Sequence, residues 1–175
     1  LSGEMDKYPE AAFFNVGTIE DVSAIVSLIH DAIVEMERHG IYQWDEVYPV
    51  ADDFKTDIIR GNLYVAVENE KIAAIYVINN ESDEAYNNVD WKCPNESSYI
   101  LHRFCVSPDF QNKGLGKQLL LKIENQIRNM GYKSVRLDVF QDNPYAQGLY
   151  LHNGYEVRGY ADWRKGRFDL MEKEL

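Results

Sequence analysis

The sequence has little cysteine and no long hydrophobic run. Only Cys93 and Cys105 are cysteines among its 175 residues, and neither stands in a CxxC or Cys/His spacing that would hold a metal ion. We therefore expect two free thiols in a reducing cytoplasm and no metal site. No stretch approaches 18 consecutive apolar residues, so no membrane span is expected. The start, Leu1 to Met5, lacks the basic and apolar regions of a signal peptide, and we expect it to be a remnant outside the fold.

Positive charge is also scarce, because 18 Lys and Arg stand against 29 Asp and Glu, a formal net charge of −11. Binding to a nucleic-acid backbone needs clustered Lys and Arg to replace counterions, so DNA and RNA are not expected as partners. An acidic field attracts cationic amines, although an acidic surface is more often explained by solubility. With 45% hydrophobic residues the chain can bury a core, and we expect a single domain over 1–175.

Hydrophobic periodicity predicts alternating strands and helices with no repeat and no linker. Thr18 and Asp21 have the spacing of a helix cap, the turn at 69–70 suits a tight hairpin, and the polar stretch 79–97 is typical of a long loop. We expect strands at 12–16, 63–68, 71–78, 99–106, 134–140, 155–163 and 167–172, and helices at 22–36, 115–130 and 144–152. A further, shorter helix is expected to start at Asp52 or Asp53 and to end at Gly61. This order, βααβββαβαββ, predicts a mixed α/β sheet with helices on both faces.

A glycine-containing loop, Gln111 to Gly116, joins the end of a strand to the start of a helix. Gly114 and Gly116 let the backbone approach a bulky anion, and the first N–H groups of the helix point at it with the positive end of the helix dipole. Lys113 and Lys117 add positive charge, although lysines at helix ends are commonly only solvated. The loop favours a pyrophosphate site; a glycine-bearing turn without a ligand is the alternative.

Two competing glycine motifs fit this loop less well. A dinucleotide fingerprint needs a third glycine where the chain has Leu119. A Walker A loop needs glycine at 111 and Ser or Thr at 118, and both positions are Gln. Neither NAD nor ATP is favoured.

Two blocks of the sequence resemble the GNAT superfamily of acetyl-CoA-dependent N-acetyltransferases. The first, 106–120, reads VSPDFQNKGLGKQLL and is similar to the family's Gln/Arg-x-x-Gly-x-Gly/Ala pattern after a strand ending in Val-x-Pro. The second, 143–155, reads NPYAQGLYLHNGY and is similar to the family's Asn-x-x-Ala-x-x-Leu-Tyr-x-x-x-Gly-Phe segment. The blocks stand in the family's order and separation. The resemblance implies a mainly antiparallel sheet in the mixed fold predicted above.

The resemblance also implies how acetyl-CoA binds, in a splayed opening between the strand ending at Val106 and the strand ending near Phe140. The pantetheine arm pairs with the backbone at 104–106 like an added strand. Asn143 hydrogen-bonds the cofactor arm, and it is equally suited to cap the helix that begins at Pro144. The cofactor-binding residues implied in this way are Phe104, Cys105, Val106, Gln111, Asn112, Lys113, Gly114, Leu115, Gly116, Lys117 and Asn143.

For catalysis the resemblance implies direct attack by a primary amine on the thioester in a ternary complex. A backbone N–H near Cys105 or Val106 polarises the carbonyl, and Tyr150 is the general acid that protonates the departing thiolate. Taken without the motif, Tyr150 would more commonly be a helix tyrosine that packs on the sheet. Non-catalytic binding or sensing of acyl-CoA is the alternative function, and a homodimer is possible.

The base is a choice among several groups. Strand alternation places His102 on the same face as Phe104 and Val106, and some relatives carry a histidine base at a matching position. A lone histidine on an apolar strand is commonly a hydrogen-bonded core residue. Ile100 stands where other relatives keep a glutamate, which leaves His102, a carboxylate from elsewhere or a water chain. Cys105 alternates to the face opposite His102 and is expected in the core.

The acceptor amine is expected to enter beside the segment between the first two helices. Tyr42, Trp44 and Tyr48 make this segment aromatic, and its acidic residues suit a cation. The alternative is a helix connector anchored to the core by its aromatic rings. The loop that carries Tyr86 and Trp91 is a weaker candidate for the same wall. The acceptor is expected to be a small-molecule or peptide amine.

Overall fold

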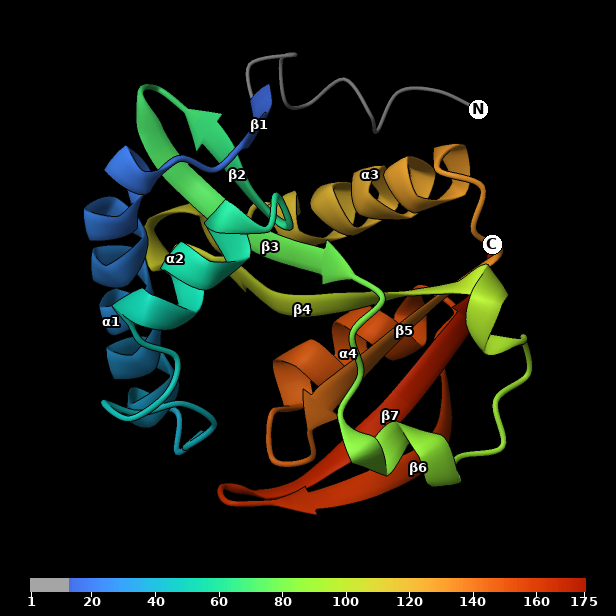
Figure 1. Ribbon diagram of the computed structural model, residues 1–175. Coiled ribbons are helices and arrows are strands. Elements are labelled where there is room, and N and C mark those ends of the chain that lie inside the picture. Colours follow the sequence, from blue (N-terminus) through green and yellow to red (C-terminus); the bar gives the residue numbers. More distant parts are fainter. Residues whose placement is uncertain (1–12) are drawn as a thin grey trace.

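The computed structural model describes residues 13–175 and confirms the predicted order of elements. The expected start of the first strand at Ala12 and the expected remnant at Leu1 to Met5 lie outside the described residues. The strands are β1 Phe13–Val16, β2 Leu63–Glu68, β3 Lys71–Asn79, β4 Ser98–Val106, β5 Ser134–Phe140, β6 Glu156–Trp163 and β7 Gly166–Glu174. The helices are α1 Val22–Arg38, α2 Ala51–Ile59, α3 Leu115–Asn129 and α4 Pro144–His152 (Figure 1).

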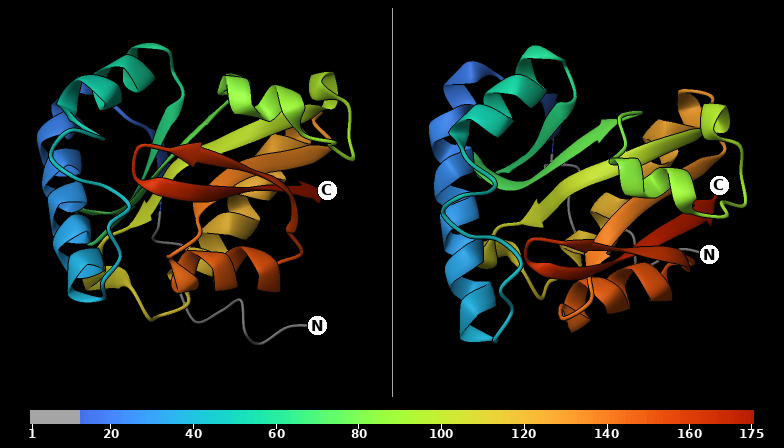
Figure 2. Two further views of the ribbon diagram at one scale, coloured as in Figure 1. Left: turned by 90° about the horizontal axis from the view of Figure 1, so that it is seen from below. Right: turned by 60° about the horizontal axis from the view of Figure 1, so that its bottom comes forward.

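The strands form a seven-stranded sheet in the order β1-β2-β3-β4-β5-β7-β6. Every neighbouring pair is antiparallel except β4 and β5, which are parallel. Helices α1 and α2 cover one face, and α3 and α4 cover the other (Figure 2). The mixed, mainly antiparallel sheet with helices on both faces is therefore confirmed.

Local sequence signals account for most element boundaries. The Asp21 carboxylate accepts a hydrogen bond from the Thr18 backbone N–H at 2.7 Å, so it satisfies a donor at the start of the first helical segment. Helix α2 begins at Ala51, one or two residues earlier than expected, because the Asp53 carboxylate accepts a hydrogen bond from the Val50 N–H at 2.8 Å. In the β2–β3 turn Asn69 and Glu70 have φ values of 51° and 62°, and a two-residue type I′ hairpin turn requires positive φ at both positions.

The stretch 79–97 is more ordered than a long loop. It holds two short 3₁₀ helices, η3 at Glu84–Asn88 and η4 at Asn95–Ser97. The Asp83 side chain caps η3 by accepting from the Ala85 N–H at 2.9 Å. Such single-turn helices leave no hydrophobic periodicity, and so the sequence pattern did not indicate them.

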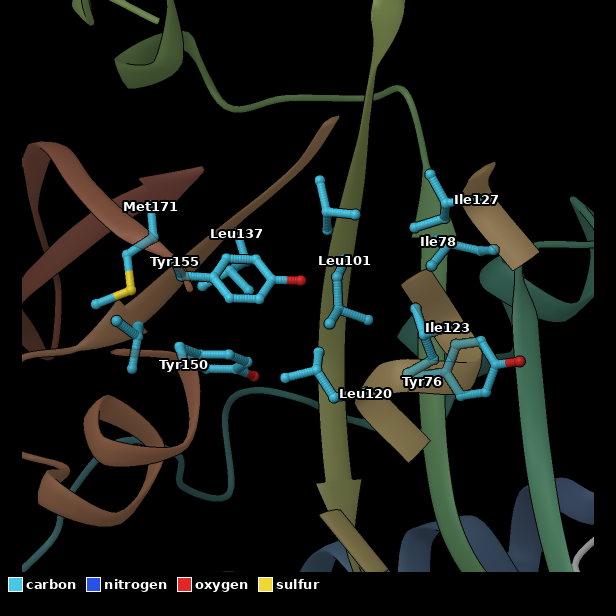
Figure 3. Packing of buried hydrophobic residues seen from close by; sticks show 12 residues of the cluster. Tyr76, Ile78, Leu101, Leu120, Ile123, Ile127, Leu137, Tyr150, Tyr155 and Met171 are labelled. Atoms are coloured by element: carbon cyan, nitrogen blue, oxygen red, sulfur yellow. The ribbon is translucent and has the colours of Figure 1, made fainter. Parts of the chain in front are cut away.

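Two hydrophobic clusters hold the helices on the sheet. On the α3 and α4 face, buried side chains from α3, β4, β5 and α4 pack together, among them Leu101, Ile123, Leu137 and Tyr150 (Figure 3). On the α1 and α2 face, Ile25, Phe54, Val77 and Cys105 belong to a second cluster. The sheet is thus buried on both faces, and β4 contributes residues to both clusters.

Strands β4 and β5 separate after a short parallel pairing. They pair only from Ser98 to Ile100 with Ser134 to Arg136, and beyond that point β5 continues against β7. A β-bulge lies in the part of β4 that does not pair with β5. Between the partners of Ile75 and Val77, β4 has one residue more than β3, and Arg103 in this segment adopts φ 48°. The predicted splayed opening between the two strands is therefore present.

Candidate active site

A cavity of about 930 Å³ lies where β4 and β5 separate. Its wall is built from β4, β5, the loop before α3 and the first turn of α3, α4, the C-terminal half of α1, the α1–α2 segment, the region of η3 and the β6–β7 hairpin. This volume lies within the usual range of ligand pockets in proteins, about 300–1,000 Å³. The structure places most of the predicted site residues in this wall: Trp44, Tyr48, His102, Phe104, Cys105, Val106, Gln111, Asn112, Gly114, Leu115, Gly116, Lys117, Asn143 and Tyr150.

The loop before α3 has the geometry of an anion cradle. Gly114 is the N-cap of α3 and has φ 78°, a left-handed conformation that is strained for residues with a side chain. Asn112 is also left-handed, at φ 60°. Gln111 fastens the loop to β4, because its Nε2 donates to the Val106 carbonyl at 3.0 Å. The first N–H groups of α3 have no partner within the helix and point toward the cavity end of the loop.

The two lysines of the loop are placed differently. Lys117 lines the cavity, as predicted for a cofactor-binding residue. Lys113 is not among the lining residues: its Nζ donates to the Asp109 carbonyl at 3.2 Å and lies 5.7 Å from the centre of the Phe110 ring. The expectation that Lys113 contacts the cofactor is therefore not supported by its position, because the lysine stem folds back along the loop.

Asn143 caps α4 and also reaches across the cavity. Its Oδ1 accepts from the Ala146 N–H at 3.0 Å, and its Nδ2 donates to Gln43 Oε1 at 3.0 Å. The expected N-cap role is thus present. One of the two N–H groups of Asn143 Nδ2 is used by Gln43, which leaves the second as a donor for a cofactor arm.

Tyr150 extends from α4 toward β4 and lines the cavity (Figure 3). Its ring packs edge-on against Tyr155, with 5.5 Å between centroids. Within residues 13–175 its hydroxyl makes no hydrogen bond. Burial first, and then the charge of Asp138, raise the pKa of Tyr150, so the phenol stays protonated and remains a hydrogen-bond donor.

The bulge at Arg103 overturns the expected placement of His102. His102 is opposite Val77 and Cys105 is opposite Ile75, so both side chains share the α1 and α2 face, away from Phe104 and Val106. The extra residue in β4 inverts the alternation on which the prediction rested. Cys105 is buried in the core, and burial raises the pKa of its thiol to about 12.

His102 is held by an amide oxygen. Asn79 Oδ1 accepts from the Glu81 N–H at 2.9 Å, so it is an acceptor, and His102 Nε2, 2.8 Å away, must donate to it. The neutral ring then carries its lone pair on Nδ1. Burial, and after it the charge of Arg103, lower the pKa of His102 to about 4, so the ring is neutral at physiological pH.

The acceptor side of the cavity contains two of the three aromatic residues predicted there. Trp44 and Tyr48 line the wall, whereas Tyr42 does not line it and is 57% exposed. The Tyr48 hydroxyl accepts from Arg103 Nη1 at 2.6 Å, and Arg103 also pairs with Asp57 at 2.6 Å. Asp45 anchors the α1–α2 segment to the β6–β7 hairpin through Arg164 at 2.7 Å and Lys165 at 3.3 Å.

Asp138 is a cavity residue that the motif comparison missed. It lies on β5 past the point where β4 diverges, and the Tyr86 hydroxyl donates to its Oδ2 at 2.9 Å. A sequence signal existed: in the run SVRLDVF, Arg136 and Asp138 are charged residues on one face of an otherwise apolar strand. Tyr86 lines the cavity as well, while Trp91, the other aromatic residue of that loop, does not.

A buried polar network anchors the segment that carries Tyr86. Glu172 on β7 pairs with Arg136 at 3.2 Å, and both side chains are at most 5% exposed. Glu172 also accepts from the backbone N–H groups of Lys92 and Cys93, at 2.7 and 3.2 Å. The Arg136 guanidinium lies 4.3 Å from the centre of the Trp91 ring. The wall residue Tyr86 is thus tied to β5 and β7 by charge-assisted hydrogen bonds.

Two features are absent from the part of the chain that the structure describes. In it, no helix combines the length and the apolar character that a membrane crossing requires. Nor do any three His, Cys, Asp or Glu side chains of these residues come together in a group that could hold a metal ion.

Comparison with known proteins places this architecture in a family. Over 158 residues the chain is 28% identical to the uncharacterized N-acetyltransferase YesJ of Bacillus subtilis, covering 89% of this chain and 86% of that protein. A GNAT family acetyltransferase from Streptococcus agalactiae has the same fold, with a TM-score of 0.83, 23% identity, and 96% and 98% of the two chains covered.

A second solved structure was determined with a ligand. PaiA N-acetyltransferase from Thermoplasma acidophilum, in complex with coenzyme A, matches with a TM-score of 0.70 and 18% identity over 93% of this chain and 98% of that one. The model of the acetyltransferase (GNAT) family matches residues 29–155, which include the glycine loop, Asp138 and Tyr150. The chain belongs to the acetyltransferase (GNAT) family and is an acyltransferase enzyme.

Proposed function

We propose that this protein is an acetyl-CoA-dependent N-acetyltransferase that acts on a primary amine by direct attack in a ternary complex. The observation that carries the proposal is the shared cavity: the glycine loop and the free hydroxyl of Tyr150 face one space between β4 and β5. Hydrogen-bond donors for phosphate oxygens at one end of this space match the pyrophosphate of CoA. The proton donor at the other end matches its thioester sulfur. The acceptor is a small-molecule or peptide amine.

The residues present fit a CoA pyrophosphate. A Cβ added at Gly114 would meet no atom within 4 Å, so the space above the loop is open. At Gly116 the nearest atoms would be Leu149 Cδ2 at 3.8 Å and Val106 Cγ2 at 4.0 Å, so this glycine borders the cavity wall. The first N–H groups of α3 and the Lys117 side chain supply positive potential. Acetyl-CoA bound here supplies an acetyl group activated as a thioester.

Strand β4 supplies the polarising donor. The Ser107 N–H donates to the Ala73 carbonyl at 2.8 Å, toward β3. Backbone groups alternate along a strand, so the Cys105 N–H points the same way and the Val106 N–H faces the opening. Of the two donors that the sequence left open, Val106 is therefore the one that can stabilise the developing oxyanion. Tyr150 gives its proton to the sulfur as the C–S bond breaks.

Binding specificity tests the first half of this proposal. Isothermal calorimetry with CoA, acetyl-CoA, NAD and ATP is expected to give tight binding only for CoA and its acetyl ester. NAD or ATP binding as tightly as CoA would contradict the pyrophosphate assignment and with it the proposed function.

Turnover tests the second half. Release of the CoA thiol from acetyl-CoA is measured with spermidine, glucosamine, kanamycin, lysine and a tripeptide with a free amino terminus. At least one amine is expected to raise thiol release above the rate without amine, with one acetyl group transferred per thiol by mass spectrometry. Tight CoA binding with no amine-dependent release would favour the alternative, a protein that binds acyl-CoA without catalysis.

A further inference from the structure

Asp138 is a carboxylate in an environment that disfavours its charge. It lies on β5 at the fork of the sheet, on the face that also carries Tyr86. Within residues 13–175 the Asp138 side chain forms no ion pair, and it accepts one hydrogen bond, from the Tyr86 hydroxyl at 2.9 Å. Asp138 is partly exposed, at the cavity wall. A carboxylate that is largely removed from water and lacks a cation costs stability unless a partner arrives. An ammonium ion from the cavity would be such a partner.

The groups around Asp138 have opposing effects on the pKa of its carboxyl group. Tyr86 on η3 donates to it, Asp83 before η3 adds negative charge, and Arg103 on β4 adds positive charge that is already paired with Asp57. From α4, Tyr150 shares the same part of the cavity, and from β7 the opposite residue is the apolar Leu170. Burial dominates and raises the pKa of Asp138 to about 6.

We propose that Asp138 is the catalytic base that takes the proton from the acceptor amine, with the Tyr86 hydroxyl as the group that positions its carboxylate. The inference rests on the proposed function, because it assigns a role in amine acetylation. The acceptor is then a primary amine that arrives as an ammonium ion, since the site offers it an unpaired carboxylate and the rings of Tyr86, Tyr48 and Trp44.

The step balances with the residues at hand. Asp138 takes one proton from the ammonium ion and passes it to water, and it takes a second from the nitrogen as the C–N bond forms. The C–S bond breaks and the sulfur takes the Tyr150 proton. The second proton, now on Asp138, then passes to the Tyr150 phenolate. The products are the N-acetyl amine, CoA with a free thiol, and one proton released to solvent.

Asp138 suits this task better than His102 does. An acid and a base serve one reaction when their surroundings push their pKa values apart, and here the pKa is about 6 for Asp138 while that of Tyr150 is raised. A base is most effective with a pKa near the working pH, and His102, at about 4, is a weaker proton acceptor. His102 Nε2 is also committed to Asn79.

The decisive experiment compares Asp138→Asn with Asp142→Asn, an exposed carboxylate just after the same strand. With the best amine of the panel, Asp138→Asn is expected to lower kcat/KM by about 10²–10⁴-fold at pH 7, with the dissociation constant for CoA unchanged. We expect an acidic limb near pH 6 in the wild-type profile, and this limb is expected to disappear in Asp138→Asn. Asp142→Asn is expected to keep both rate and profile.

Tyr86→Phe separates positioning from folding. The hydrogen bond from Tyr86 stabilises the charged carboxylate, so its loss is expected to move the acidic limb to higher pH. The plateau rate is expected to fall less than in Asp138→Asn. A purely structural role of Tyr86 would lower thermal stability without moving the limb.

A measurement on the wild-type protein decides the matter even without turnover. The side-chain carboxyl carbons of ¹³C-labelled aspartate are titrated by NMR in the presence of CoA, with Asp138 assigned by its absence in Asp138→Asn. Titration near pH 6, shifted to lower pH by 2-phenylethylamine, would support the proposal. Titration at an ordinary carboxyl value with no response to the amine would overturn it, as would full kcat/KM in a folded Asp138→Asn; absence of turnover in every protein would count against the proposed function alone.

Discussion

The two walls of the cavity differ in how the chain builds them. On the cofactor side, the loop 111–116 and the first turn of α3 are consecutive in sequence and form a cradle through their own backbone. On the acceptor side, contacts join distant segments: Asp45 and Lys165, 120 positions apart, are 3.3 Å apart in space, and Tyr86 meets Asp138 across 52 positions. A local motif can specify the first wall, whereas the second depends on the whole sheet.

The largest expected effect is on the chemical step, which needs both walls. Tyr150→Phe is expected to lower kcat by about 10²–10⁴-fold and to leave the dissociation constant for acetyl-CoA unchanged, because the lost hydroxyl acts when charge reaches the sulfur. Steady-state kinetics and calorimetry measure the two quantities. The matched control is Tyr155→Phe, which removes the hydroxyl from the ring packed against Tyr150. Full kcat in Tyr150→Phe would assign proton donation to solvent.

The next effect tests whether the acceptor wall depends on tertiary anchors. Glu172→Gln is expected to reduce the free energy of unfolding by about 3–5 kcal/mol, because it leaves the buried Arg136 charge without its partner. The acceptor KM is expected to rise, since Tyr86 is anchored through this network, while CoA affinity is kept.

Its control is the same substitution in an exposed ion pair. Glu81 pairs with Arg60 at 2.8 Å with both side chains more than half exposed, so Glu81→Gln is expected to cost about 1 kcal/mol or less. Denaturant unfolding measures both. Equal costs for the two variants would show that the Glu172 network does not anchor the wall.

A smaller effect concerns the local wall. Gly114→Val and Gly116→Val are each expected to weaken CoA binding at least tenfold, about 1.4 kcal/mol, because a branched side chain blocks the approach of the phosphates. Gly61→Val is the control for backbone strain: Gly61 has φ 72° and, like Gly114, no atom within 4 Å of an added Cβ. Unchanged CoA affinity in folded loop variants would place the pyrophosphate elsewhere.

The smallest effect is expected at His102. A proton acceptor must be unprotonated, so a group with a pKa of about 4 can limit the rate only near that pH, well below the limb expected from Asp138. His102→Gln is therefore expected to keep the acidic limb near pH 6 in the kcat/KM profile. Loss of that limb in His102→Gln, with its retention in Asp138→Asn, would restore His102 as the base.

The sequence alone predicted the elements and the cofactor wall for a physical reason. Periodicity, caps and turn residues act over a few positions, and the pairing of a strand end with a glycine-started helix places N–H donors without help from distant segments. Boundaries were displaced only where a side chain capped a different N–H, as Asp53 does for α2. The exposed position of Tyr42 was not predictable, because the path of the α1–α2 segment is set by Asp45 and its partners on the β6–β7 hairpin.

The faces of β4 show where local inference ends. Alternation assigned His102 to the face of Phe104, and one bulged residue at Arg103 moved it to the face of Cys105. The sequence by itself determined the family fold, the glycine loop before α3 and the motif that carries Tyr150, because these follow from contiguous patterns. The tertiary structure alone decided that Asp138, Tyr86 and Arg103 share the acceptor side, since the fork of β4 and β5 and the bulge bring together residues that no local pattern connects.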